Sequence, residues 1–534
     1  MQKSRLVLLS ILSGVLLALG WFPNGIFPFL FFAFIPLLIV EEHFYRDRDL
    51  KPRLLFALSY LAFFIWNILT TWWIKNASFG GAALAIICNA LLMSFTFMLY
   101  HSVKKRIGQK WSSVLFICFW ISFEFFHNNW ELSWPWLTLG NAFADAPSII
   151  QWYEYTGIFG GTLWILLMNV FLLNFILSFK TISKKQKQKD VLIILTVLLV
   201  PMLVSVLLKP IINFNKGGIS VVLVQPNIDP YNEKFEAPYD EQLKKMLALA
   251  EQKVTAETDY VIFPETALVE DNIWEGAINQ SGSVAILNAF LKKYPKLKII
   301  TGASTGKLYQ PGEELSVTAR KFTQEEGYYD SYNTALQLDN SGKIQIYHKS
   351  KLVPGVEQMP FPFIFKHLEG LAIDLGGTTG GLGTQEERTV FASPGGQMKV
   401  APVVCYESIY GEYVSQYVRN GANFIAIITN DGWWGDTPGY KQHLRFGGLR
   451  AIETRRWVVR SANTGISCFI DPYGKIMQPT KWWTPDVIEQ RIQLNYEETF
   501  YTKYGDYIAR AALCITFAML IYSLLIRFRI IKKS

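Results

Sequence analysis

Eight long apolar runs constrain the fold of this chain more than any other feature. A helix needs about 20 apolar residues to cross a bilayer. Runs near that length lie at 6–21, 26–40, 54–74, 82–100, 111–127, 158–179, 191–208 and 511–526. The first resembles a signal peptide, but it has no small-x-small cleavage site before Trp21, and another apolar run follows at once, so we expect it to be retained. The sequence therefore predicts an integral membrane protein with a multi-span α-helical bundle.

Lysine and arginine are concentrated in alternate loops between these runs. They precede the first run, follow the second, fourth and sixth, and follow the eighth, whereas the intervening loops are almost without bases. Basic loops stay in the cytoplasm. The pattern predicts that both termini are cytoplasmic and that residues 211–506 lie across the membrane. Because the net charge of +8 reflects these loops, it does not indicate a nucleic-acid partner.

The block at 211–506 has a different character from the flanking runs. Short β-branched stretches alternate there with helix-like segments, which is typical of an α/β domain. The predicted strands are 219–224, 260–263, 298–300, 334–338, 343–347, 400–404, 424–429, 457–461 and 467–470. We therefore predict three parts: a membrane domain at 1–210 with seven helices, an extramembrane α/β domain at 211–506, and an eighth helix with a cytoplasmic tail at 507–534.

Neither cofactors nor metals are indicated. The five cysteines form no CxxC pair and the histidines form no HExxH pair, so we expect neither a disulfide framework nor a metal site. The glycine-dense stretch 376–383 lacks the Lys-Ser/Thr and following helix of a phosphate loop.

Three predicted strands of the block end on reactive side chains. Glu265 follows one, Lys349 and Lys351 follow another, and Cys405 follows 400–404. Each has a structural alternative: an acid at a helix N-terminus, lysines on a solvated edge, and a buried thiol. Strand periodicity places both lysines on one face and does not choose between them. A thiol nucleophile needs a base, and its addition intermediate needs a cation or donors for the oxyanion, which Glu, Lys and Cys would supply.

These residues lie in local motifs that resemble the nitrilase, or carbon–nitrogen hydrolase, superfamily. The motifs are Val-Gln-Pro-Asn-Ile (224–228), Phe-Pro-Glu-Thr-Ala (263–267), Tyr-His-Lys (347–349), Val-Pro-Gly-Val-Glu (353–357), Val-Cys-Tyr-Glu (404–407) and Asn-Asp-Gly-Trp-Trp-Gly-Asp (430–436). With the flanking spans and Ser-Trp-Pro-Trp-Leu (133–137), they narrow the resemblance to the apolipoprotein N-acyltransferases of the bacterial inner membrane. The resemblance covers nearly the whole chain and implies an α-β-β-α sandwich for the α/β domain.

The resemblance also implies roles for single residues. Glu265 matches the general base, Cys405 the nucleophile and Lys349 the cation that stabilises the oxyanion. The family spacing selects Lys349 over Lys351, because Glu357 then matches a glutamate that the family requires.

Further positions follow from the same motifs. Tyr406 and Glu407 match residues that the family requires, and the backbone N–H of Tyr406 would complete the oxyanion site. The family commonly has a tryptophan where this chain offers Phe235, which we expect to contact an acyl chain. Trp433 is a second candidate for such a contact, with core packing as its alternative. The apolar stretch 359–365 would either dip toward the membrane or pack in the core.

The activity that the resemblance implies is acyl transfer through a cysteine thioester, without a cofactor. A phospholipid would donate the acyl chain, and the N-terminal α-amine of a diacylglyceryl-modified apolipoprotein would accept it. The enzyme would be a monomer of the inner membrane with a periplasmic catalytic domain.

Two alternatives stay open. A membrane-tethered amidase or other hydrolase would share the triad but release its acyl group to water, although a tether needs only one span. A transporter or receptor should carry ionisable residues along a path within its spans, where the sequence offers only Glu124.

Overall fold

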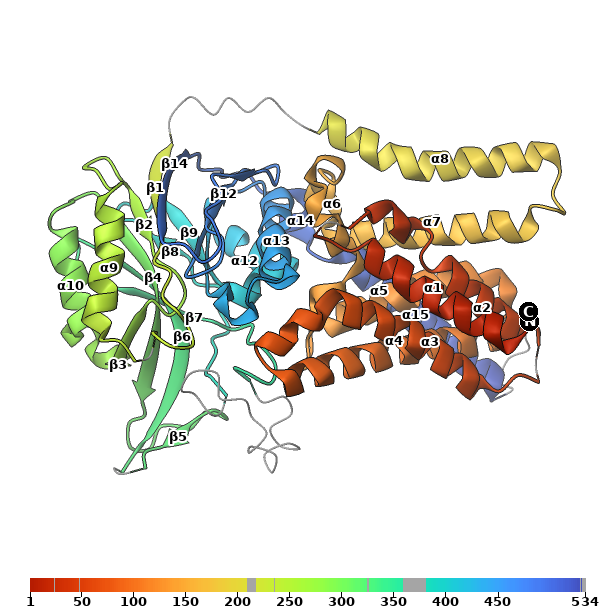
Figure 1. Cartoon of the computed structure of the whole chain (residues 1–534), viewed down its shortest axis with the longest axis horizontal. Helices are drawn as coiled ribbons and strands as arrows, with labels where there is room; N and C mark the ends of the chain where they lie inside the picture. The colour runs from red at the N-terminus through yellow and green to blue at the C-terminus, as the bar shows by residue number, and fades with distance from the viewer. Residues whose placement is uncertain are drawn as a thin grey trace. The chain divides into compact units, whose positions relative to one another are not determined.

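The computed structural model describes residues 1–23, 25–47, 49–208, 218–234, 236–323, 326–358, 381–528 and 530. The chain forms two compact units: Met1–Pro210 with Tyr504–Ser534, and Ile211–Lys503. Figure 1 labels the helices and strands of both units.

The first unit is a bundle of helices. Its long helices are α1 (Lys3–Leu19), α2 (Ile35–Arg46), α3 (Pro52–Thr71), α4 (Phe79–Ile107), α5 (Ser112–His127), α7 (Ile158–Ser178), α8 (Lys184–Leu207) and α15 (Tyr507–Arg527). Each overlaps one of the eight apolar runs. Among the described residues, six segments are long and apolar enough to cross a membrane, whereas α1 and α5 have 17 and 16 residues. The prediction of a multi-span helical membrane protein is confirmed.

A polar side chain hydrogen-bonds to the backbone where the helix of the second span is broken. The short 3-10 helix η1 (Phe27–Phe31) precedes α2, and backbone groups at the break are paired by Asn169 of α7. Its Nδ2 donates to Leu30 O at 2.7 Å, and its Oδ1 accepts from Phe34 N at 2.8 Å. Backbone at membrane depth needs such partners because lipid offers none.

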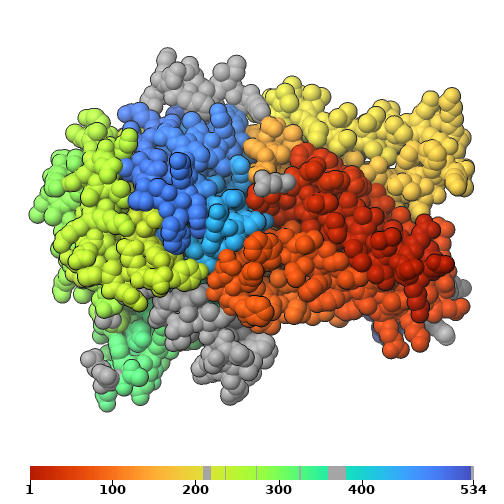
Figure 2. Space-filling model, viewed as in Figure 1, coloured from red at the N-terminus to blue at the C-terminus, as the bar shows by residue number. Residues whose placement is uncertain are grey.

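Helix α8 is the least covered helix of the bundle. Only 6% of its most apolar window is buried, and Figure 2 shows it, in yellow, open along the visible face. Leu192, Leu203 and Val206 are among its exposed apolar side chains. In a membrane-spanning helix, such a surface faces lipid.

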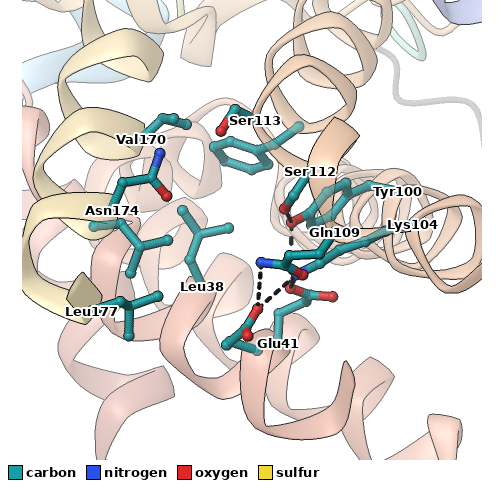
Figure 3. A pocket seen from close by; sticks show the side chains of 13 residues that line it. Leu38, Glu41, Tyr100, Lys104, Gln109, Ser112, Ser113, Val170, Asn174 and Leu177 are labelled. Carbon is teal, nitrogen blue, oxygen red and sulfur yellow. Dashed lines mark hydrogen bonds and ion pairs between the residues drawn. The ribbon is translucent and has the colours of Figure 1, made fainter. Parts of the chain in front are cut away.

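Helices α2 and α4 extend beyond the apolar runs that predicted them and carry buried charges in the extensions. Lys104 Nζ lies 2.5 Å from Glu41 Oε2 and 3.0 Å from Glu42 Oε2. These residues, with Tyr100 and Gln109, line a polar cavity of about 20 Å³ (Figure 3), which is room for one water molecule. Glu124 is therefore not the only ionisable residue buried in the bundle, because helices continue past the ends of their apolar stretches.

The second unit contains two β-sheets. One has the order β14-β1-β2-β4-β6-β5, with β3 beside β4 and β7 beside β6. Its strands are β1 (Ile219–Gln225), β2 (Tyr260–Ile262), β3 (Leu268–Trp274), β4 (Lys298–Leu308), β5 (Arg320–Lys321), β6 (Tyr328–Asp339), β7 (Gln345–His348) and β14 (Asp486–Ile492). The other has the order β13-β12-β11-β10-β9-β8. Its strands are β8 (Phe391–Ala392), β9 (Lys399–Val404), β10 (Phe424–Thr429), β11 (Val458–Ala462), β12 (Cys468–Ile470) and β13 (Ile476–Met477).

Helices cover the outer face of each sheet. Helices α9 (Tyr239–Glu251) and α10 (Gly282–Leu291) pack on the first sheet, and α12 (Gly411–Arg419) and α13 (Pro438–Thr454) pack on the second (Figure 1). The sheets meet face to face, with β1 against β11 and β6 against β9. This arrangement is the α-β-β-α sandwich that was predicted.

The buried parallel strands bring the candidate catalytic side chains to the carboxyl-terminal end of each sheet. Every residue of β1, β2 and β10 is buried, as is usual for parallel strands that are covered on both faces. Strand β2 is parallel to β1 and β4, and β10 is parallel to β9 and β11. Ligands bind at the carboxyl ends of such strands, which is where Glu265 and Cys405 lie.

Candidate active site

Glu265 is held at the carboxyl end of β2 by neutral donors and by one cation. Its Oε1 accepts from Asn333 Nδ2 at 2.8 Å and from Lys349 Nζ at 3.0 Å, and its Oε2 accepts from the backbone N of Asn430 at 3.0 Å. The segment lies so close to β4 that a Cβ at Gly302 would be 2.7 Å from Glu265 Cα. The carboxylate is therefore fixed in position and only 6% exposed.

Lys349 lies between two carboxylates just after β7. Its Nζ is 3.0 Å from Glu265 Oε1 and 2.7 Å from Glu357 Oε1. Burial alone would raise the pKa of Glu265, but the charge of Lys349 and the bond from Asn333 outweigh it and lower that pKa. Burial likewise opposes the charge on Lys349, but the two carboxylates raise its pKa. The pair is therefore ionised at neutral pH.

Cys405 stands at the sharp turn where β9 passes into the 3-10 helix η9 (Cys405–Ile409). Its φ is +50°, in the left-handed region that a non-glycine residue enters at a cost. The residue is neither fully buried nor fully exposed. Burial and the charge of Glu265 raise the pKa of its thiol, while the charge of Lys349 lowers it. The resting sulfur therefore keeps its proton.

The two lysines that periodicity could not separate lie in different environments. Lys349 is 1% exposed and interacts electrostatically with both Glu265 and Cys405. Lys351 Nζ instead lies over the ring of Tyr410, at 4.8 Å from its centroid. Lys349 thus contacts Glu265, and Cys405, although far away in sequence, lies near enough to interact electrostatically with both.

Glu407 joins the chain around Cys405 to the chain around Lys349. Its Oε2 accepts from Val404 N at 2.8 Å, and its Oε1 accepts from Ser350 N at 2.7 Å. Tyr347 and Tyr413 donate to Oε1 at 2.5 and 2.7 Å. Burial raises the pKa of Glu407, although these bonds oppose it. This carboxylate is fully buried and links the segment after β7, in the first sheet, to the end of β9, in the second.

The remaining predicted residues lie around this cluster or outside the described residues. Tyr406 is buried, with its ring 5.4 Å from that of Tyr410. Trp433 is partly exposed, and its carbonyl accepts from Tyr231 OH at 2.7 Å. Phe235 and the apolar stretch 359–365 lie outside the residues that the structure describes. Acyl-chain contact by Phe235 and Trp433 stays a prediction.

Asn333 is a member of the cluster that sequence reasoning missed. Besides Glu265, its Nδ2 lies 3.3 Å from Glu357 Oε1, and its backbone oxygen accepts from Lys349 N at 2.8 Å. The available signal was a polar residue directly before the predicted strand 334–338; in the structure both belong to one continuous strand, β6.

A second missed group is a buried ionic network beneath Cys405. Asp431 Oδ2 lies 2.6 Å from Arg460 Nη2, and Asp431 Oδ1 lies 2.9 Å from His443 Nδ1. The other ring nitrogen of His443 lies 3.1 Å from the backbone oxygen of Cys405. The network therefore contacts the nucleophile candidate through its backbone. Among the described residues, no group of His, Cys, Asp and Glu is arranged to hold a metal ion.

Comparison with known proteins agrees with this geometry. Residues 220–501 match the model of the carbon-nitrogen hydrolase family, and residues 13–171 match that of the apolipoprotein N-acyltransferase N-terminal domain. The first match covers more than half of the chain, which therefore belongs to the carbon–nitrogen hydrolase family, a family of enzymes.

Relatives over the full length narrow the resemblance. The chain is 29% identical to an apolipoprotein N-acyltransferase of Chlorobaculum tepidum, over 96% of this chain and 95% of that protein. It is also 29% identical to one of Rickettsia prowazekii, over 98% and 99%. The predicted resemblance to apolipoprotein N-acyltransferases is thereby confirmed. Among solved structures, Saccharomyces cerevisiae Nit3 of the nitrilase superfamily aligns with 53% of this chain and 91% of its own, at 17% identity and a TM-score of 0.36.

Proposed function

We propose that this protein is an N-acyltransferase that moves an acyl chain from a phospholipid to the N-terminal α-amine of diacylglyceryl-cysteine apolipoproteins, the last step of lipoprotein maturation. The observation that carries the proposal is the convergence of Glu265 and Lys349 with Cys405 in a carbon–nitrogen hydrolase domain whose chain also spans the membrane. The full-length relatives named for this activity support it.

In the first half-reaction, Cys405 becomes acylated. Its thiol proton passes to Glu265 as the sulfur attacks the ester carbonyl of the phospholipid. Lys349 and the backbone N–H of Tyr406 stabilise the negative charge that develops on the carbonyl oxygen. The tetrahedral intermediate then collapses: the ester C–O bond breaks, the leaving alkoxide takes the proton from Glu265, and a thioester remains on Cys405.

In the second half-reaction, the α-amine of the apolipoprotein attacks the thioester. The C–N bond forms, the C–S bond breaks, and the amine proton passes through Glu265 back to the sulfur. Conversion of a thioester to an amide is downhill, so no nucleotide is consumed. Glu357 supports Lys349 by ion pairing and thereby keeps the cation in place between the two half-reactions.

The alternating basic loops support a periplasmic location for this chemistry. Both termini would be cytoplasmic, the chain would span the bacterial inner membrane, and the catalytic domain would face a compartment without ATP. An acyl donor there must be a pre-formed ester, and phospholipids are the abundant esters. We expect a monomer to suffice, because the three proposed catalytic residues lie in one chain.

The test is to incubate the purified protein with phospholipid alone. The mass of the proteolytic peptide that contains Cys405 is then measured by mass spectrometry. We expect a mass increase of one acyl chain that hydroxylamine removes. Cys405→Ala should abolish it, whereas Cys514→Ser, in the helix α15, should not. Free fatty acid without an acylated peptide would favour the hydrolase, and neither product would favour a transporter or receptor.

A further inference from the structure

A second buried lysine, Lys234, lies at the site without a role in the reaction described above. It is 3% exposed, in the loop between β1 and α9. Its Nζ donates to Glu265 O at 3.3 Å and also to Thr266 Oγ1. Two bonds fix its backbone: its N donates to Asp229 O, and its carbonyl accepts from Gln242 Nε2, both at 2.9 Å. The ammonium group is therefore directed toward the end of β2 rather than toward solvent.

The charges of the site explain why a second cation would be useful there. Glu265 and Glu357 share Lys349 as their ion-pair partner. When Cys405 passes its proton to Glu265, the thiolate and Glu357 are two anions against that one cation. The nearby cation Arg460 offers no relief, because its charge is already paired with Asp431. Buried anions without compensation are costly.

We propose that Lys234 is a positioning residue whose positive charge balances the ionised form of Cys405 and so eases formation of the thiolate. The proposal deepens the proposed function and rests on Cys405 being its nucleophile. The groups that face Lys234 across the site are Glu265, after β2, and Cys405, after β9; both interact electrostatically with its ammonium.

The titration of Lys234 predicts that its effect on Cys405 depends on pH. Burial lowers the pKa of Lys234 to about 8, against the opposing charges of Glu265 and Cys405. Lys234 is therefore mostly protonated at neutral pH and loses its charge as the pH rises through about 8. Its assistance to Cys405 should fade over the same range. A lysine that only anchored the loop would have no such pH dependence.

The experiment measures the rate at which iodoacetamide alkylates Cys405 in the purified full-length protein between pH 6 and pH 9, without lipid. The Cys405 peptide is quantified by mass, so that the other cysteines do not contribute. Because the thiolate is the reactive form, the rate reports how readily Cys405 ionises. A nearby cation lowers a thiol pKa by about one unit or more, so Lys234→Met should slow alkylation about tenfold at pH 7. The deficit should shrink above pH 8, and Lys234→Arg should retain most of the wild-type rate at pH 7.

Two control variants separate charge from loop structure. Gln242→Leu removes the bond to the Lys234 carbonyl but keeps the ammonium, and Lys245→Met removes an exposed lysine that pairs with Glu233 at 3.7 Å. We expect Lys245→Met to alkylate at the wild-type rate, and Gln242→Leu to lose much less of the rate than Lys234→Met because it keeps the ammonium. An unchanged rate in Lys234→Met would overturn the proposal, as would an equal, pH-independent loss in Gln242→Leu and Lys234→Met. Since no lipid is present, the result stands apart from whether phospholipid acylates Cys405.

Discussion

At the scale of single residues, the buried charges of the catalytic domain fall into sets that differ in how they are compensated. Glu265 and Asp431 face cations, and their pKa values are lowered. Glu407 faces neutral donors, and burial raises its pKa. The first two therefore add to stability in the ionised form, whereas Glu407 depends on its hydrogen bonds.

Asp431 predicts how the stability of this domain depends on pH. Burial alone would raise its pKa, but the charges of Arg460 and His443 outweigh burial and lower it below the ordinary 3.8. A lowered pKa contributes stability that is present above the unfolded-state pKa and is lost as the pH falls through the folded-state value. The thermal unfolding midpoint should therefore fall steadily below about pH 4. Asp431→Asn should cost about 3–5 kcal/mol at neutral pH, because it leaves Arg460 without its partner, and should reduce the acid-dependent loss.

The measurement is tryptophan fluorescence during heating in detergent at a series of pH values. Asp436→Asn is the matched control, since Asp436 is exposed and its ion pair with Lys441 spans 3.9 Å; it should follow the wild type. The slope that remains in Asp431→Asn comes from the other carboxyls whose pKa is lowered, among them Glu265 and Glu270. An Asp431→Asn protein with the full wild-type acid loss would contradict this assignment.

At the scale of elements, several strands leave their sheets through a residue in the left-handed region. Asn227 follows β1, Thr266 follows β2 and Cys405 follows β9, with φ values of 51°, 45° and 50°. Such a residue turns the chain abruptly at the edge of the sheet. The backbone strain therefore gathers where the reactive side chains stand, as is common at functional sites.

This strain predicts a difference between two inactive variants. Cys405→Ala and Cys405→Gly both remove the thiol, but only glycine adopts a φ of +50° without a steric penalty. After the larger entropy of glycine in the unfolded chain is subtracted, Cys405→Gly should be more stable than Cys405→Ala by about 0.5–1 kcal/mol. Denaturant unfolding followed by fluorescence would measure it. Cys468→Gly against Cys468→Ala, within the buried strand β12, should show the opposite order.

The strands differ in whether the sequence could predict them. Strands β1, β2, β9 and β10 are continuous apolar runs, and their buried state made them recognisable. Strand β14 was missed because its polar residues alternate with buried ones, as expected for an antiparallel edge strand beside β1.

The site residues could be predicted from the sequence where they directly follow a recognisable strand. Glu265 and Cys405 end recognisable strands, so their positions could be predicted. Lys349 and Lys351 share one strand face, and only tertiary contacts separate them. Lys234 stands in a loop among Asp229, Glu233 and other charged residues, where nothing local distinguishes a buried lysine from a solvated one.

At the scale of the whole molecule, the distribution of charge among the loops predicts which side of the membrane each part occupies. The loop before α8 and the first turns of that helix are together rich in lysine, whereas the α/β domain begins after the helix ends. If α8 crosses the membrane, these two regions lie on opposite sides. Moving lysine-rich loops across the membrane is unfavourable, so the loop should be cytoplasmic and the α/β domain periplasmic.

Two single cysteines would test this topology. Lys185→Cys lies at the start of α8, and Gln252→Cys lies just after α9; both positions are exposed. A membrane-impermeant maleimide applied to intact spheroplasts should label Gln252→Cys at once and Lys185→Cys only after the membrane is broken. The unsubstituted protein gives the background from Cys88 and Cys514, which are exposed on helices of the bundle. Labelling of Lys185→Cys, but not Gln252→Cys, in intact spheroplasts would reverse the orientation and would leave the catalytic domain in the cytoplasm, where an ATP-dependent acyl donor would be available.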